Sequence, residues 1–373
     1  MMKSPKLKIA AFPRDPNPYQ GLLYSEMQRL GTEVSYLGEL TPSRTLNVLL
    51  LPFELAAKRI AGTNIIHLHW VFGFSLPGAR RFSCMRWVSY FWFRVWLRTC
   101  RALRMRLVWT AHNVLPHDQV FPDDISARLL LTNASDLIIA HSHTTLAELA
   151  ALGCVGRQTT VIPHGPINPK RCTPLRVPGT GTKHRQLLFL GRIHDYKGVE
   201  DLLSAFGAII DDIDAHLTVA GQCDDAALRS RLEMLAPKNS KKCSLRLERI
   251  PEEEISDLLE VADVVVLPFR QVTTSGSAML ALSYGRPLIV PGLDALADFP
   301  DQAVFRYEGE ATGLRVALKD AARVDSETLA RMSDAAFRYA SETTWLEIAN
   351  KTVHEMKSIH SGMLGDQSLG RES

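Results

Sequence analysis

The sequence predicts an α/β protein with two doubly wound parallel-sheet domains in series. Its 373 residues are more than one hydrophobic core usually needs. Short apolar runs of strand character alternate with longer helical stretches, first across residues 7–142 and again across 185–292. The runs are continuously apolar, which indicates strands covered by helices on both faces of each sheet.

The predicted N-terminal domain spans 1–166, with strands expected at 7–12, 64–70, 106–112 and 136–142. Three prolines and two glycines make 167–183 unsuited to helix or strand and predict a linker. A C-terminal domain, 184–343, follows. Its strands are expected at 185–192, 215–222, 244–250, 262–269 and 286–292. A last helix, 344–360, is expected to pack back toward the N-terminal domain, ahead of a disordered tail, 361–373.

Composition and charge argue against several classes of protein. A formal net charge of +3 is too small to indicate bulk nucleic-acid binding, so no nucleic-acid partner is expected. The six cysteines show neither C-x-x-C pairs nor zinc spacing, which favours reduced thiols in a cytoplasm. The N-terminus lacks the apolar run of a signal peptide, and no stretch of ~18–20 apolar residues predicts a spanning helix.

Two loops of the C-terminal domain are suited to anions. The first carries Gly191, Arg192, Lys197 and Gly198 where a strand ends and a helix begins, at the sheet edge where ligands bind. Its arginine and lysine can both reach a diphosphate. In the second loop a helix begins near Ser277. Its first amides, with the hydroxyls beside them, form an anion seat made of Thr274, Ser275, Gly276 and Ser277. A solvated basic loop and a plain N-cap are the structural alternatives.

The N-terminal domain offers candidates for the acceptor side of a reaction. Asn17 and Tyr19 follow the first strand, while His69 and His112 end later strands, so all four are expected at the same sheet edge. His112 could orient or deprotonate a hydroxyl, because histidine changes charge near neutral pH. Asp15 and Asp118 are alternative bases. Other histidines compete for the role: His67, His141, His143 and His164.

Residues 79–106 form a basic, aromatic segment with eight arginines and no acid. Such a helix can lie in a membrane interface, with its rings at headgroup depth and its arginines on anionic phosphate. The residues expected to contact a membrane are Arg86, Trp87, Trp92, Arg94 and Arg98. A helix that buries its aromatic side chains on the sheet, or a nucleic-acid patch, are the alternatives.

Several short motifs together resemble those of GT-B glycosyltransferases, nucleotide-sugar enzymes with two Rossmann-like domains. These motifs are V-I-P-H-G at 161–165, G-R-x4-K-G at 191–198, A-D-V-V-V-L-P at 262–268 and G-R-P at 285–287. The resemblance implies that Arg192 and Lys197 hold the donor diphosphate, that the C-terminal domain binds the nucleotide and that the N-terminal domain binds the acceptor. It also implies that the two domains face each other across a cleft.

One departure from the family concerns the E-x7-E pair of many retaining members, because Val272 and Leu280 stand where the two glutamates would be. Whether the sugar is transferred with retention or inversion is left open. The variant pattern that includes N-P-Y-x3-L-Y at 17–24, H-L-H-W at 67–70 and T-A-H-N-V-x-P-H at 110–117 looks like bacterial exopolysaccharide enzymes. Those enzymes transfer mannose from GDP-mannose to a polyprenyl-diphosphate glycolipid.

The expected function is therefore transfer of a hexosyl group from a nucleoside-diphosphate sugar, with GDP-mannose favoured, to a lipid-linked or polysaccharide-precursor glycan. No cofactor or metal is expected, because basic side chains and a helix N-terminus can stabilise the leaving diphosphate. The basic helix favours a peripheral location on the inner face of the cytoplasmic membrane. Alternatives are a UDP-sugar-dependent glucosyl- or glucuronosyltransferase, a related epimerase, and a nucleotide-binding module without turnover.

Overall fold

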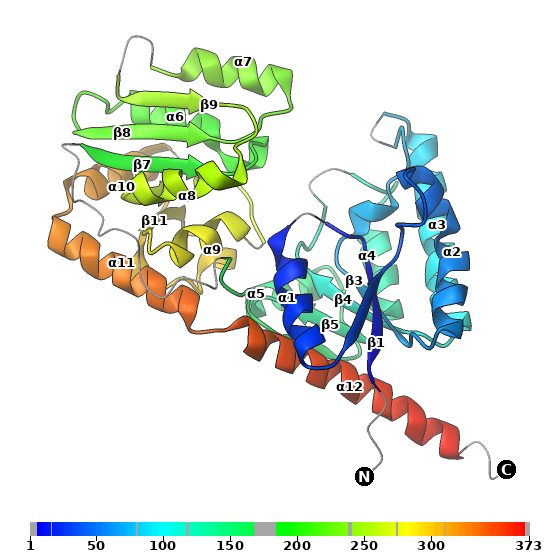
Figure 1. Cartoon of the computed structure of the whole chain (residues 1–373). Helices are drawn as coiled ribbons and strands as arrows, with labels where there is room; N and C mark the ends of the chain where they lie inside the picture. Colours follow the sequence, from blue (N-terminus) through cyan, green and yellow to red (C-terminus); the bar gives the residue numbers. More distant parts are fainter. Residues whose placement is uncertain are drawn as a thin grey trace. The chain divides into compact units, whose positions relative to one another are not determined.

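The computed structural model describes residues 6–15, 17–79, 81–116, 119–167, 184–237, 241–273, 275–309 and 311–369. The chain divides into two compact units (Figure 1). The first unit comprises Met1–His164 together with Trp345–Ser373, and the second comprises Gly165–Thr344. Of the expected linker, only Ile167 lies inside the described residues.

The described part of the first unit contains a six-stranded parallel sheet in the order β2-β1-β3-β4-β5-β6. Its strands are β1 (Lys8–Phe12), β2 (Glu33–Tyr36), β3 (Ile65–Leu68), β4 (Arg106–Ala111), β5 (Leu137–Ala140) and β6 (Thr159–Val161). The two edge strands, β2 and β6, were not expected, because they are short and lack the continuous apolar run of a strand buried on both faces.

Helices cover both faces of this sheet. They are α1 (Pro18–Arg29), α2 (Arg44–Ile60), α3 (Ser83–Ala102), α4 (Asp124–Ala134) and α5 (His143–Ala151), with a 3-10 turn η1 (Val71–Phe74) after β3. One apolar core contains residues of α2, α3 and α4, including Leu51, Phe93 and Leu131, and the other contains Leu23 and Met27 of α1.

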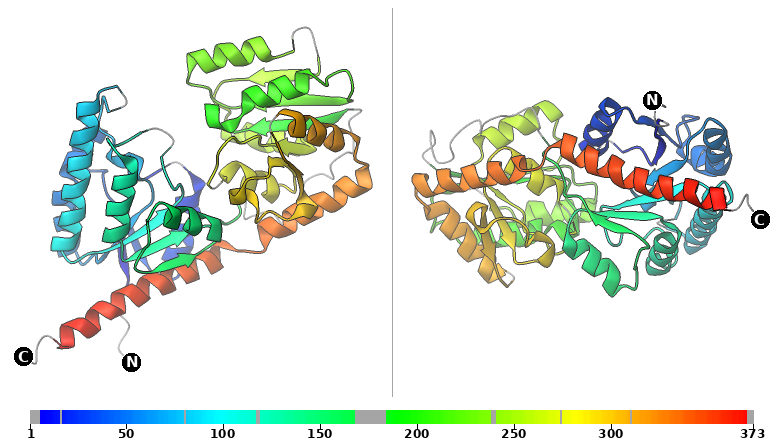
Figure 2. Two further views of the ribbon diagram at one scale, coloured as in Figure 1. Left: turned by 180° about the vertical axis from the view of Figure 1, so that it is seen from behind. Right: turned by 90° about the horizontal axis from the view of Figure 1, so that it is seen from below.

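The last helix, α12 (Trp345–Leu369), belongs to the first unit and completes its second core. Ile348 and Met356 are fully buried there, in the same cluster as Ile9 of β1. Figure 2 shows this red helix lying along the first unit. The expected boundary at 360 is wrong, because the helix continues to Leu369. No proline interrupts 361–369, and a glycine weakens a helix by ~1 kcal/mol without ending it.

The described part of the second unit repeats the design, with a six-stranded parallel sheet in the order β12-β11-β10-β7-β8-β9. Its strands are β7 (Arg185–Leu190), β8 (Ala215–Ala220), β9 (Cys243–Arg246), β10 (Val264–Val266), β11 (Leu288–Pro291) and β12 (Val304–Tyr307). Edge strand β12 was not expected, because charged Arg306 interrupts its apolar pattern.

The helices of the second unit pack on both faces of its sheet, over two apolar cores. They are α6 (Val199–Gly207), α7 (Ala226–Leu235), α8 (Glu252–Val261), α9 (Gly276–Ser283), α10 (Ala311–Arg323) and α11 (Ser326–Ser341), with 3-10 turns η2 (Asp195–Lys197), η3 (Asp294–Leu296) and η4 (Asp301–Ala303). In both sheets the strand order reverses beside the unit's first strand, between β1 and β3 and between β7 and β10. Ligands bind at the carboxyl ends of strands at such switch points.

Candidate functional site

The switch point of the second unit is built on glycines that let backbone segments meet. Gly198 is left-handed, with φ of 68°, and a Cβ there would lie 1.9 Å from the carbonyl oxygen of Pro268. At Gly221, with φ of 155°, a Cβ would lie 1.9 Å from the carbonyl oxygen of Gly191. Only glycine permits this approach of the loops after β7, β8 and β10.

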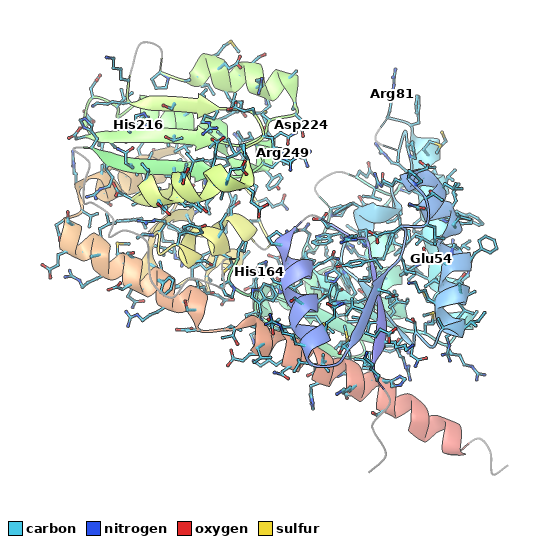
Figure 3. All side chains as sticks on the ribbon, viewed as in Figure 1. Glu54, Arg81, His164, His216, Asp224 and Arg249 are labelled. Atoms are coloured by element: carbon cyan, nitrogen blue, oxygen red, sulfur yellow. The ribbon has the colours of Figure 1, made fainter. Side chains whose placement is uncertain are left out.

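A cavity of about 230 Å³ lies at this edge. Three predicted donor-site residues line it, namely Gly191, Arg192 and Ser277. The other lining residues are Leu190, Gly221, Gln222, Arg249, Ile250, Ile255 and Leu280. Figure 3 labels Arg249 beside Asp224, at the edge toward which β7, β8 and β9 point. Sequence reasoning missed Gln222 and Arg249, although each stands at the carboxyl end of an expected strand, where the same edge rule would have found them.

Arg192 is exposed and already paired. Its Nη2 donates to Asp224 Oδ2 at 2.5 Å, and this hydrogen bond lowers the pKa of Asp224. Gln222 Nε2 donates to the other oxygen of the same carboxylate at 2.6 Å. A diphosphate that binds Arg192 must therefore compete with Asp224 for the guanidinium.

Lys197 ends turn η2, and its ammonium lies 4.5 Å from the ring centroid of Phe269 and 5.3 Å from that of Tyr196. Burial lowers the pKa of Lys197 to about 8. Lys197 and Gly198 are not among the residues that line the 230 Å³ cavity. A cation held on aromatic rings and short of water is prepared for an anionic partner.

Helix α9 begins at Gly276, with Ser275 as its N-cap. The Ser275 hydroxyl accepts from the amide of Ala278 at 3.1 Å, so this side chain caps the helix. Ser277 reaches toward Gly191, since its Oγ lies 2.8 Å from where a Cβ of Gly191 would be. Thr274 lies outside the described residues.

The two residues that stand in place of the E-x7-E glutamates pack as apolar side chains. Val272 is buried in the core, and Leu280 is half-buried, packs against the same core and lines the 230 Å³ cavity. This wall of the cavity therefore offers no carboxylate at either position.

Sequence reasoning also missed an ion-pair network around Arg270. Its guanidinium holds both oxygens of Asp201, at 2.7 and 2.9 Å, and Oδ2 of Asp195 at 3.2 Å. Its backbone amide donates to the carbonyl of Tyr196 at 2.9 Å. Arg270 therefore fixes the loop that carries Lys197 to the end of β10.

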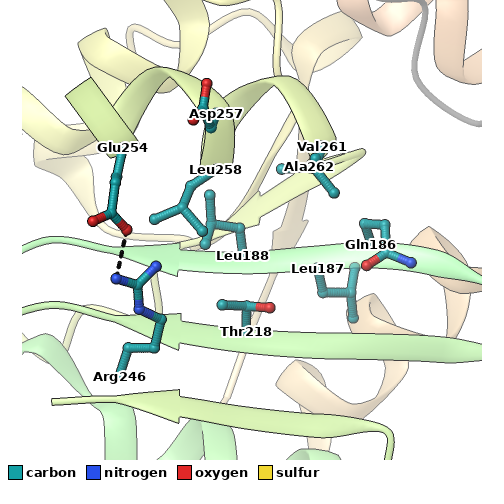
Figure 4. A pocket seen from close by; sticks show the side chains of 10 residues that line it. All are labelled: Gln186, Leu187, Leu188, Thr218, Arg246, Glu254, Asp257, Leu258, Val261 and Ala262. Carbon is teal, nitrogen blue, oxygen red and sulfur yellow. Dashed lines mark hydrogen bonds and ion pairs between the residues drawn. The ribbon is translucent and has the colours of Figure 1, made fainter. Parts of the chain in front are cut away.

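Another cavity of the second unit, about 210 Å³, lies between α8 and the strands β7, β8 and β9 (Figure 4). An ion pair between Arg246 Nη2 and Glu254 Oε2, 2.6 Å long, stands on its wall. None of the predicted site residues lines this cavity.

In the first unit, buried side chains at the carboxyl edge form a hydrogen-bonded chain. Tyr24 OH contacts His67 Nδ1 at 2.9 Å and His69 Nε2 at 2.6 Å. The chain continues from His69 Nδ1 to His112 Nε2 at 3.0 Å and from His112 Nδ1 to His141 Nε2 at 3.2 Å. Thr110 Oγ1 contacts His67 Nε2 at 2.8 Å at one end, and the carbonyl of Ile162 contacts His141 Nδ1 at 2.9 Å at the other.

One acceptor sets the direction of every hydrogen bond in this series of histidine side chains. The carbonyl of Ile162 can only accept, so His141 carries its proton on Nδ1 and, when neutral, accepts at Nε2. The same logic then makes His112 and His69 donors at Nδ1, and Tyr24 donates to His69 Nε2. Burial lowers the pKa of His67 and His141 to about 3 and keeps the pKa of His69 and His112 well below the usual range. These four rings are therefore neutral near pH 7.

The remaining acceptor-side candidates pack against the histidine chain or lie in the loop before α1. Tyr19 is buried, and its ring centroid lies 4.8 Å from that of His112. Asn17 Oδ1 caps α1 by accepting from the amide of Tyr19, and Asp15 Oδ1 accepts from the amide of Asn17 at 2.8 Å. Burial raises the pKa of Asp15. Asp118 lies outside the described residues.

Helix α3 presents only part of its predicted membrane face to solvent. Trp87 is 61% exposed, and Arg94 and Arg98 are exposed too. Trp92 is half-buried, and its Nε1 donates to the carbonyl of Val48 on α2 at 2.7 Å. Arg86 is half-buried and donates to the carbonyl of Ala79 and to Gln119. A helix turns by about 100° per residue, so one face of α3 cannot include all five positions.

No helix among the described residues is long and apolar enough to cross a membrane. Nor do the described histidines, cysteines and acids include a group of three or more placed to hold a metal ion.

Residues 184–332 match the family model described as glycosyl transferases group 1. The second unit is a group 1 glycosyltransferase domain. The chain is also similar to GDP-mannose:glycolipid 4-beta-D-mannosyltransferases from two sources of Xanthomonas campestris pv. campestris, with 32% and 31% identity over 129 residues. The matched stretch covers 34% of this chain and 36% of each relative, so the chain spans about a third of their length in this comparison.

Solved structures share the fold over most of the chain. Sucrose-phosphate synthase from Thermosynechococcus elongatus is 16% identical, with a TM-score of 0.70 over 96% of this chain and 100% of that one. Anabaena HepE, solved with UDP and glucose, is 14% identical, with a TM-score of 0.69 over 94% of this chain and 100% of that one. The chain therefore has the GT-B fold, as the sequence predicted, and its glycosyltransferase domain carries the 230 Å³ cavity.

Proposed function

We propose that the protein transfers a hexosyl group from a nucleoside-diphosphate sugar, GDP-mannose, to a lipid-linked glycan. The observation that carries the proposal is the 230 Å³ cavity of the glycosyltransferase domain, where Arg192 and the start of α9 meet at the switch point. The choice of GDP-mannose rests on the mannosyltransferase relatives and on the motifs of the N-terminal half. A lipid-linked acceptor implies work at the inner face of the cytoplasmic membrane, with exposed Trp87 toward the lipid.

In this reaction the leaving diphosphate gains negative charge. The Arg192 guanidinium exchanges Asp224 for a phosphate oxygen, and the first amides of α9 point their N–H groups toward the same anion. Lys197 adds a positive charge whose pKa rises when the anion binds. With Val272 and Leu280 in place of the acids, the sugar is held by other groups.

On the acceptor side we assign His112 and Tyr19 to the wall that orients the hydroxyl. Both ring nitrogens of His112 already have histidine partners, so His112 can take a proton only if the hydrogen bond from His69 breaks. Asp15, whose raised pKa brings it closer to neutrality, is the other candidate base. Asn17 and His69 hold the loop and the ring in place.

The first experiment is a thermal-shift panel of UDP, GDP and ADP, followed by their sugars. A ligand that binds only the native state raises its stability, by about 2.7 kcal/mol at a hundred times its Kd. Selective stabilisation by GDP and GDP-mannose is expected, and transfer of radiolabelled mannose to a lipid extract would follow. If no nucleotide shifts the folded protein, the donor site is absent and the proposal fails.

A second candidate is a UDP-sugar-dependent transferase, because a structural neighbour of the whole chain was solved with UDP and glucose. Selective stabilisation by UDP in the same panel would replace GDP-mannose with a UDP-sugar.

A further inference from the structure

A large cavity of the first unit is lined by six arginines. It has a volume of about 520 Å³, within the range of small-molecule sites. It lies where α3 runs into β4, where α4 runs into β5 and before β6, so it stands at the amino ends of these strands. The histidine chain lies at the carboxyl ends of the same strands. The six residues of β4, which rise about 3.3 Å each, separate the two sites.

The lining of this cavity is strongly positive. Its arginines are Arg94, Arg98, Arg101, Arg104, Arg106 and Arg157. One acid, Asp136, belongs to the lining, and it is committed to Arg106 at 2.7 Å and to the amide of Leu107 at 2.9 Å. Within the described parts of the chain, none of the other five arginines forms an ion pair. A cavity with five unmatched guanidinium groups favours an anion with several acceptor oxygens.

The helix ends that meet here explain only part of this charge. Helices α3 and α4 lie side by side and both end at the cavity, where the negative ends of their dipoles favour cations (Figure 2). That effect fades within the last turn of a helix, whereas Arg94 lies more than two turns before the end of α3 and Arg157 comes from beyond α5.

A second observation is the backbone of Arg104. Its φ is 51°, and it is the one non-glycine residue with positive φ among those described. It follows the C-cap of α3, where the amide of Arg104 bonds the carbonyl of Arg101 and the amide of Met105 bonds that of Cys100. Four other helices, α1, α2, α5 and α9, end in the same pair of bonds. Each of them places a glycine at the left-handed position, namely Gly31, Gly62, Gly153 and Gly285.

The chain thus uses glycine for this turn everywhere in its described residues except at the arginine cavity. There it carries a long cation in a conformation that disfavours side chains. The two capping hydrogen bonds account for the left-handed backbone, but glycine would serve them equally well. The Arg104 guanidinium is exposed and makes no hydrogen bond or ion pair with another described residue, so this side chain is available to a ligand.

We propose that the arginine cavity at the amino edge of the first sheet is a second binding site, for a phosphomonoester or diphosphate group. Arg98, Arg101 and Arg104 are its principal contacts, and Arg106 is already oriented by Asp136. The group comes either from a lipid headgroup or from a soluble anion, since the two share this chemistry. The proposal is independent of the transfer reaction.

The test uses full-length protein with Arg192→Ala and Lys197→Ala, so that the donor loop cannot bind the probe. Calorimetric titration with inorganic pyrophosphate is expected to show one saturable site that weakens with added salt. Arg104→Ala and Arg98→Gln should each weaken it about tenfold, the size of one lost charged hydrogen bond. Arg29→Gln is the matched control, an exposed arginine on α1 outside the cavity, and should leave the affinity unchanged.

Arg104→Gly separates binding from folding. It should weaken pyrophosphate like Arg104→Ala but raise the Tm by about 2 °C, because glycine relieves the left-handed strain that alanine keeps. A fall in Tm would mean that Arg104 stabilises the fold, and the argument from its backbone would be lost. No binding by the folded parent protein, or equal affinity in the cavity variants, overturns the proposal.

Vesicle co-sedimentation identifies the source. If the ligand is a headgroup, phosphatidylcholine vesicles containing phosphatidic acid should retain the protein, Arg104→Gly should reduce retention, and pyrophosphate should compete. Pyrophosphate binding that depends on the cavity, with vesicle retention that does not, assigns the site to a soluble anion.

Discussion

Lys197 is the single residue on which the donor proposal can be tested most sharply. Its ammonium lies over the ring of Phe269 rather than in an acidic pair, so removing it unbalances no buried charge. Lys197→Ala is expected to reduce transfer at least ~100-fold, as for other groups that stabilise a developing anion, with little change in Tm. Lys351→Ala, an exposed lysine of α12, is the control.

The pH dependence of donor binding follows from the same residue. Its pKa of about 8 means that the free enzyme loses this charge as pH rises through 8. Nucleoside-diphosphate affinity should then fall by up to about tenfold per pH unit, and Lys197→Arg, which stays charged, should flatten the profile. An identical profile in both proteins would remove Lys197 from the site.

Gly198 offers a test of the loop itself. Gly198→Ala combines left-handed strain with a Cβ 1.9 Å from the carbonyl of Pro268, whereas Gly31→Ala has the same strain and open space. The first substitution should cost at least ~2 kcal/mol more unfolding free energy than the second, because backbone must move. Urea unfolding of the two variants measures the difference, and equal costs would mean that the loops separate easily.

At the scale of an element, the histidine chain connects the carboxyl ends of β3, β4, β5 and β6 to one another and, through Tyr24, to α1. Its four rings are neutral in the folded state but titrate near 6.5 when unfolded. Because their folded pKa values are lowered, the unfolded state binds more protons below pH 6.5. Stability present above pH 6.5 is therefore lost as pH falls toward 3, by up to ~1.4 kcal/mol per pH unit for each ring.

Urea unfolding between pH 7.5 and 4.5 measures this slope. His67→Gln should reduce it by about one proton, while His143→Gln, an exposed histidine outside the chain, should leave it unchanged. Stability that stays constant from pH 7 to 5 would contradict neutral, buried rings.

The sequence predicted strands β1, β3, β4 and β5 well because each is built around consecutive buried apolar residues. The histidine chain could not be predicted in the same way. His67, His69, His112 and His141 are visible as candidates, yet His67 reaches His69 through a tyrosine hydroxyl on α1, more than 40 positions earlier than His67. The direct contacts of His112 with His69 and His141 depend on how three strands pair. Likewise, Trp92 and Trp87 look alike in the sequence, and only the helix rotation makes one a half-buried hydrogen-bond donor and the other an exposed ring.

For the whole molecule, α12 tests whether the first unit depends on the chain's last helix. Met356 is fully buried in the core that it shares with Ile9, whereas Leu346 on the same helix is 48% exposed. Met356→Ala is expected to cost ~2–5 kcal/mol of unfolding free energy, and Leu346→Ala under ~1 kcal/mol. Equal costs, measured by urea unfolding, would mean that α12 is only loosely packed.

The membership of α12 in the first unit also sets an order of events during synthesis. Residues 6–164 leave the ribosome long before Trp345, so Ile9, Leu23 and Met27 must wait for a covering surface while the entire second unit is translated. At about 5–20 residues per second this delay lasts on the order of ten seconds or more. The domain made first is thus finished last, and a chaperone that shields its open face during that interval would act on apolar surface that the mature protein no longer displays.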